Sequence, residues 1–106
     1  MSVVIWVIKM DKKEEFRKYY LDIFSFKKKI TDRDDFEFLK SEVDQLARNK
    51  DITFAMALDL IAGMLDYEFE NNNAKGAREK ETIALTNFEL FRTMAETENH
   101  DESKNH

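Results

Sequence analysis

Hydrophobic residues recur with helical spacing along most of this 106-residue chain. In the first such segment they stand at i, i+3, i+4, i+7 and i+8, which is one face of a helix. These positions are Phe16, Tyr19, Tyr20, Ile23 and Phe24. Asp11 is a suitable N-cap, and Glu14 follows three residues later in a box-like arrangement. We therefore predict a first helix over about residues 11–26.

A second helix is predicted from a narrower apolar stripe. Its members step by three, four and three residues, and charged residues occupy the other faces. They are Phe36, Leu39, Val43 and Leu46. Thr31 or Asp32 can cap the start of this helix, and the pattern fades near Asn49.

The third predicted helix starts after Asp51 or Thr53, reaches about Glu70, and is apolar over most of its circumference. The polar or small positions that fall within a sector of about 60° are Asp59, Gly63, Asp66 and Glu70. A helix with so wide an apolar surface should be central and wrapped by the others.

A turn over residues 71–73 and Gly76 separates the third helix from a fourth, which we predict over about residues 77–95. Its inward positions are Ile83, Ala84, Phe88, Phe91 and Met94. Residues 96–106 include no apolar side chain. The expected organisation is one helical domain over residues 1–95, followed by a disordered polar tail over residues 96–106.

The scarcity of turn residues decides the fold class. The chain has two glycines and no proline, whereas all-β folds need turn residues at short intervals. We therefore predict an all-α protein, a compact bundle of about four helices around the third one.

The N-terminal segment, residues 1–9, departs from this pattern. Residues 3–8 are all β-branched or aromatic, which favours a short β-strand buried on both faces. Such a strand must pair with its own copy in a homodimer or with the sheet edge of a partner. Two alternatives stay open: the segment extends the first helix, or it is a leader preceding a translation start at Met10.

Composition argues against catalysis and against metal or cofactor binding. The chain has no cysteine, and its two histidines, His100 and His106, stand in the polar tail, so zinc-site patterns are absent. No serine stands in a Gly-x-Ser-x-Gly context, and two glycines thirteen residues apart cannot form a phosphate-binding loop. We expect a protein that is not an enzyme and has no cofactor.

No membrane-spanning or secretory segment is predicted either. The longest apolar run has six residues, whereas a spanning helix needs about twenty. We expect a cytoplasmic protein, and the residue usage would suit a bacterium of low GC content or its phage.

Charge is distributed unevenly along the chain. The net charge is −5, with eight basic and four acidic residues (+4) in residues 1–30 and nine basic and eighteen acidic residues (−9) in residues 31–106. Charge asymmetry of this kind bears on partners rather than on fold. The leading hypothesis is a small acidic protein that works by binding a macromolecule, as an inhibitor, adaptor or regulatory subunit.

The predicted partner contacts come from two places. They are Val4, Trp6 and Ile8 in the N-terminal segment, and Asp59, Asp66 and Glu70 on the third helix. On one reading the three carboxylates line a shallow groove that receives a basic partner. On the other they lie in water or pair with Arg78, Lys80 or Arg92, while the small residues Ala55, Ala62 and Gly63 allow a tight helix crossing.

The alternative hypothesis is a transcriptional regulator that binds nucleic acid through its basic first helix. Phosphates would be contacted by Lys13, Arg17, Lys27, Lys28 and Lys29. Phe24 lies among them and either stacks on a base or belongs to the core. Residues 43–62 have the outline of a helix-turn-helix, but their second helix begins without the side chains that read bases.

Overall fold

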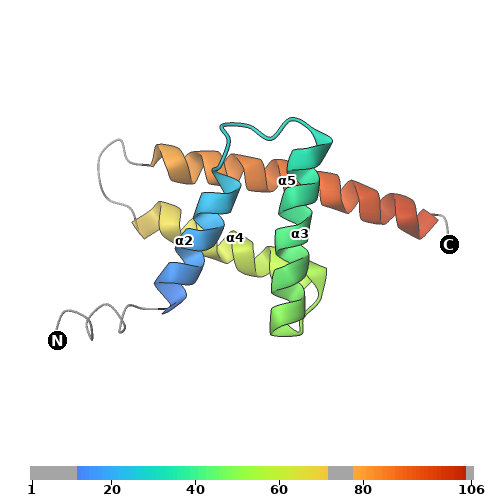
Figure 1. Ribbon diagram of the computed structural model, residues 1–106, viewed down its shortest axis with the longest axis horizontal. Helices are drawn as coiled ribbons and strands as arrows, with labels where there is room; N and C mark the ends of the chain where they lie inside the picture. Colours follow the sequence, from blue (N-terminus) through green and yellow to red (C-terminus); the bar gives the residue numbers. More distant parts are fainter. Residues whose placement is uncertain (1–11, 72–77, 105–106) are drawn as a thin grey trace.

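The computed structural model describes residues 12–71 and 78–104, and every regular element in these ranges is an α-helix. The helices are α2 (Lys12–Phe24), α3 (Arg33–Lys50), α4 (Phe54–Asn71) and α5 (Glu79–Lys104). All four pack together (Figure 1), which confirms the predicted all-α bundle.

The helices form two layers. Helices α4 and α5 lie side by side and run in opposite directions, while α2 and α3 lie across them (Figure 1). Each of the two crossing helices packs against both α4 and α5. The connection over residues 25–32 passes along one edge of the molecule from the end of α2 to the start of α3 (Figure 1).

Two of the predicted capping residues begin the helices that follow them. The Asp32 carboxylate accepts a hydrogen bond from the backbone N–H of Asp35 at 2.9 Å, and Thr53 Oγ1 accepts one from Met56 at 3.1 Å. Each bond satisfies a backbone N–H group of the first helical turn, which has no acceptor within the helix. Asp51 belongs to the end of α3, where it adopts a left-handed conformation with φ 55°.

An aromatic cluster forms the centre of the core. The fully buried rings are Phe24, Phe36, Phe88 and Phe91. The centroid of Phe91 lies 5.2 Å from that of Phe36, 5.9 Å from Phe24 and 6.4 Å from Phe54. Phe91 therefore joins α5 to an aromatic ring from each of the other three helices, at distances typical of favourable ring pairs.

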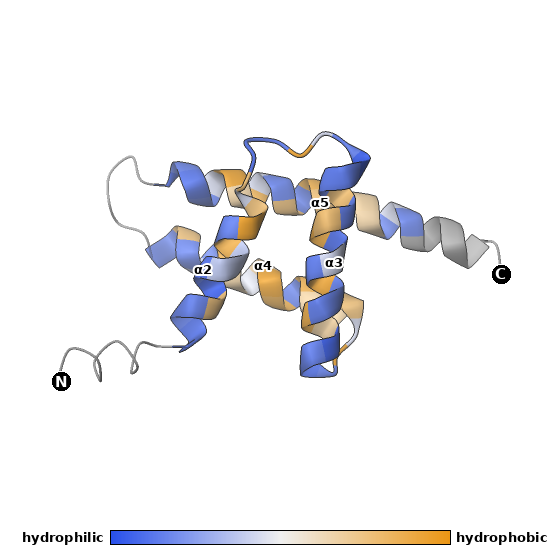
Figure 2. Cartoon of the chain, in the orientation of Figure 1, coloured by the Kyte–Doolittle hydropathy of each residue, from blue (hydrophilic) through white to orange (hydrophobic). Residues whose placement is uncertain are grey.

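The prediction that the third helix is wrapped by its neighbours is not confirmed. Helix α4 contacts all three other helices, but Met56, Leu60 and Tyr67 remain 53%, 40% and 48% exposed. The reason is the two-layer arrangement, in which none of the four described helices covers this side of α4. Each described helix carries both hydrophobic and hydrophilic positions (Figure 2), and on α4 part of the hydrophobic surface faces solvent.

Two helix ends differ from their predicted positions. Helix α2 ends at Phe24, and Ser25 turns back so that its hydroxyl donates to the carbonyl of Leu21 at 2.6 Å. Helix α5 continues to Lys104, so the predicted end near Ala95 and the absence of helix after it are wrong. Polar residues sustain this extension, since Glu98 pairs with Arg33 at 2.7 Å and with Lys40 at 3.7 Å.

Burial of the α5 positions follows the prediction at Ala84, Phe88 and Phe91, which are fully buried. Ile83 is only half-buried, and Met94 is exposed. The predicted N-terminal strand, with Val4, Trp6 and Ile8 and the homodimer through residues 3–8, lies outside the described residues.

Candidate functional site

An open groove of about 690 Å³ lies between α2 and α4 and is bordered by the end of α3. Its apolar surface comes from Phe16 on α2 and from Leu60, Met64 and Tyr67 on α4. The other lining residues are Lys12, Lys13, Arg17, Lys50, Asp59 and Gly63. We call this feature the α2–α4 groove.

Gly63 stands in the middle of α4 with open space before it. A Cβ atom added there would meet no heavy atom of the described chain within 4 Å. At Gly63 the described residues therefore make no tight helix crossing. A mid-helix glycine costs about 1 kcal/mol relative to alanine, and packing among the described residues gives no reason for it here.

Four basic residues line the groove on the side of α2 and α3. Arg17 is held in place, with its Nε 3.4 Å from a Glu68 carboxylate oxygen and its Cζ 4.2 Å from the Tyr67 ring centroid. The Nζ of Lys50 lies 5.2 Å from the ring centroid of Phe16, within cation–π range. The remaining two, Lys12 and Lys13, are exposed at the start of α2.

The predicted acidic residues follow the opposite side of α4. Asp59 lines the groove and pairs with Arg92 at 3.0 Å, one of the three basic partners expected for these carboxylates. Asp66 and Glu70 are exposed about two and three helical turns further on. Of the three carboxylates, only Asp59 lines the α2–α4 groove, and the other two continue along the same side of α4.

The structure divides the five basic residues of the nucleic-acid hypothesis between two places. Lys13 and Arg17 border the groove, whereas Lys27, Lys28 and Lys29 belong to the loop after α2. The five therefore do not form one surface. Phe24 is fully buried in the core, which excludes its stacking on a base in this fold.

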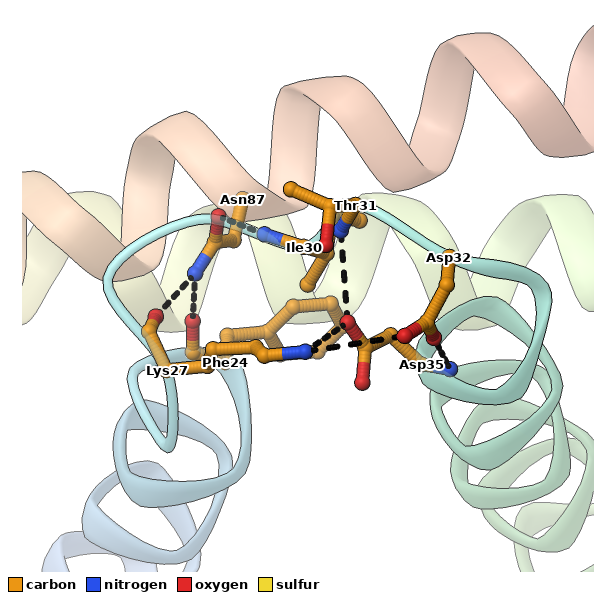
Figure 3. A network of polar contacts seen from close by, with 7 residues as sticks. All are labelled: Phe24, Lys27, Ile30, Thr31, Asp32, Asp35 and Asn87. Atoms are coloured by element: carbon orange, nitrogen blue, oxygen red, sulfur yellow. Dashed lines mark hydrogen bonds and ion pairs between the residues drawn. The ribbon is translucent and has the colours of Figure 1, made fainter.

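In that loop, Lys27 is part of an ion pair rather than an open contact (Figure 3). Its Nζ lies 2.6 Å from one carboxylate oxygen of Asp35, which also accepts the backbone N–H of Thr31 at 3.2 Å. The hydrogen bond from Lys27 holds the pKa of Asp35 below its ordinary value of 3.8, and the same bond raises the pKa of Lys27. Lys28 and Lys29 are exposed.

Asn87 is a key polar residue that the sequence analysis does not identify. Its fully buried amide accepts a hydrogen bond from Ile30 N–H at 3.1 Å and donates to the carbonyls of Phe24 at 2.9 Å and Lys27 at 2.8 Å (Figure 3). We call these three bonds the Asn87 clamp. They close the end of α2 and fix the loop onto α5, because buried backbone groups need partners.

The part of the chain that the structure describes contains no group of three or more metal-ligating side chains. Within the same residues, no helix has the length and apolar character needed to cross a bilayer.

Comparison with known proteins does not assign the chain to a class. No protein-family model matches it, and neither a curated protein nor a solved structure shows significant similarity to it.

Proposed function

We propose that the chain acts by binding another protein, an apolar segment of which docks in the α2–α4 groove. It would serve in the cytoplasm as an inhibitor, adaptor or regulatory subunit, and its composition would suit an origin in a phage or other mobile element. The observation that supports the proposal best is Gly63, a mid-helix glycine facing open space within an apolar groove.

The exposed apolar surface supports the same proposal. Leu60 and Tyr67 line the groove and remain exposed, and Met56 extends the exposed surface by one helical turn. Water contact with contiguous apolar surface is unfavourable, so surfaces of this kind tend to be interaction sites. The groove is open at its surface and lies between two helices, which suits a segment of another chain.

The experiment is an affinity recovery from a native lysate of the source cells, with and without nuclease, using the wild type and two tryptophan variants. Gly63→Trp fills the groove from a position with free space, and Thr86→Trp is the matched control on the exposed face of α5. We expect a stoichiometric protein that survives nuclease, is retained by Thr86→Trp and is lost with Gly63→Trp. Equal recovery by the two variants would overturn the proposal.

Nucleic-acid binding is the competing outcome. It would use the loop lysines. If several phosphates are contacted, the affinity for nucleic acid should fall about tenfold or more between 50 and 200 mM salt. A nuclease-sensitive recovery that is lost in a Lys28→Glu/Lys29→Glu variant but retained in Gly63→Trp would move the function to this loop.

A homodimer through residues 3–8 is a separate prediction and is compatible with either partner. Light scattering at several concentrations tests it, and a monomer at all of them would remove it.

A further inference from the structure

We infer that the occupant of the α2–α4 groove is an amphipathic helix that crosses α4 at Gly63 and carries acidic side chains along the edge that faces α2. This inference rests on the proposed function and specifies its partner. Three features carry it: the open face of Gly63, the arrangement of the apolar residues beside it, and the sign of the charges on the rim.

Gly63 sets the point of closest approach. Two helices come closest where their contacting side chains are small, and a glycine with nothing in front of it leaves that approach open to a second backbone. The space is unused by the described residues, and we assign the approach that it permits to a partner helix.

The exposed apolar residues of α4 match a helical occupant in length. Met56, Leu60 and Tyr67 fall within about 40° of one another around the helix, and Gly63 is adjacent to them. From Met56 to Tyr67 the helix rises by about 16 Å, which is three turns. A strand-like occupant needs a free sheet edge, and residues 12–71 and 78–104 include no strand to provide one.

The charges that line the groove favour a bound helix with an acidic edge. Four cations and one carboxylate line the groove, although the whole chain has a net charge of −5. The carboxylate, Asp59, already pairs with Arg92, and Arg17 pairs with Glu68. Lys12 and Lys50 therefore set the sign of the charge that a partner would meet along the α2 side. Complementary charges across an interface favour the correct partner and its register.

Asp66 and Glu70 continue the line of Asp59 along α4, within a sector of about 60°, so this side of α4 has the opposite sign. A helix lying between the two edges would place carboxylates toward Lys12 and Lys50, and basic side chains toward Asp66 and Glu70. Because the two edges differ in charge, only one direction of the bound helix satisfies both of them. The acidic residues of α4 thus fix the polarity of the partner.

The test uses three fluorescent helical peptides of about sixteen residues. All three carry leucines at i, i+4, i+7 and i+11, which form one apolar face, and one alanine stands among these leucines. The first peptide has glutamates on one edge and lysines on the other, the second has glutamates on both, and the third has lysines on both. Fluorescence anisotropy should show the first peptide binding the wild type at least about tenfold more tightly than the third.

Two variants with equal changes in net charge test whether the differences in peptide affinity come from the charged residues that line the groove. In Lys12→Glu/Lys50→Glu the α2 side becomes acidic, so the all-lysine peptide should bind about tenfold more tightly than it binds the wild type. Lys28→Glu/Lys29→Glu changes the net charge equally in the exposed loop and should preserve the wild-type ranking. Circular dichroism checks that each variant remains helical.

The outcomes separate this inference from the proposed function. If the three peptides bind equally, or if the rim variant leaves their ranking unchanged, the acidic-edged helix is wrong. Protein capture that Gly63→Trp abolishes would still support the groove. If Gly63→Trp alters neither peptide binding nor protein capture, both proposals are wrong.

Discussion

The two ends of α2 are completed in opposite ways. At its C-terminal end the Asn87 clamp satisfies the carbonyl of Phe24 and two groups of the following loop, and the rings of the core pack directly beneath. At its N-terminal end Phe16 borders an open groove, across which Gly63 faces free space. One end is closed by interactions within the chain, and the other leaves apolar surface uncovered.

This difference indicates where the sequence is shaped by the fold and where another requirement acts. A buried asparagine with three hydrogen bonds is explained by the backbone groups it satisfies. An exposed mid-helix glycine has no such explanation among the described residues, and departures from local stability are expected at functional sites. The comparison therefore agrees with a stabilising role for the clamp and with the proposed binding role for the groove.

The largest expected effect is at the closed end, in Phe91→Ala. Removing this fully buried ring takes the aromatic partner from rings on all three other helices. The free energy of unfolding should fall by about 3–5 kcal/mol, measured by urea denaturation followed by circular dichroism. Phe26→Ala removes an exposed ring and should cost less than about 1 kcal/mol, and equal losses in the two variants would contradict the assigned core.

Asn87→Ala should cause the next largest loss in the free energy of unfolding. It leaves one N–H and two carbonyls without their buried partner, and each such group costs about 1–3 kcal/mol, reduced where water can enter. We expect a total loss of about 3 kcal/mol in urea denaturation. Asn49→Ala, at an exposed position near the end of α3, is the control, and a loss as small as the control's would show that the clamp is not needed.

Gly63→Ala should act in the opposite direction. The added methyl group meets no heavy atom, so the gain in helix propensity of about 0.5–1 kcal/mol should appear as increased stability. Ser41→Gly on the exposed face of α3 is the converse control and should lose about 0.5 kcal/mol. A destabilised Gly63→Ala protein would contradict the open groove.

The smallest expected effect is the pH dependence of stability that comes from the Lys27–Asp35 ion pair beside the clamp. Because Lys27 lowers the pKa of Asp35 in the folded state, the stabilisation is present above the ordinary pKa of 3.8 and is lost as the pH falls through the lower folded value. Asp35→Asn should therefore be less stable than the wild type at neutral pH, and the difference should shrink toward about pH 2 in urea titrations. A difference independent of pH would assign the loss to the hydrogen bonds of Asp35 alone.

Local signals account for the parts of the fold that are predictable from the sequence. Asp32 and Thr53 cap helices because the required hydrogen bonds join residues three apart, and the stripe from Phe36 to Leu46 is buried as its spacing requires. The end of α5 is mispredicted because Glu98 is stabilised by α3, through Arg33 and Lys40, rather than by apolar neighbours of its own. Spacing alone also cannot show that Met56, Leu60 and Tyr67 of α4 face away from the other described helices.

The candidate site was predictable in its residues more than in its arrangement. Gly63 and Asp59 stand out in the sequence, but only the structure shows that none of the described helices covers Gly63 and that Arg92 pairs with Asp59. Asn87 carries no local signal, because an asparagine within an amphipathic helix is usually exposed. Its burial depends on groups of a loop far away along the chain.

That separation has a kinetic consequence. The three bonds of the Asn87 clamp join residues 57, 60 and 63 positions apart, so they form only after α5 has docked on α2. Contacts made after the transition state for folding leave the folding rate nearly unchanged and slow the reverse reaction instead. We predict that these polar bonds form after the Phe24–Phe88 ring contact between the same two helices, so that Asn87→Ala should speed unfolding more than it slows folding.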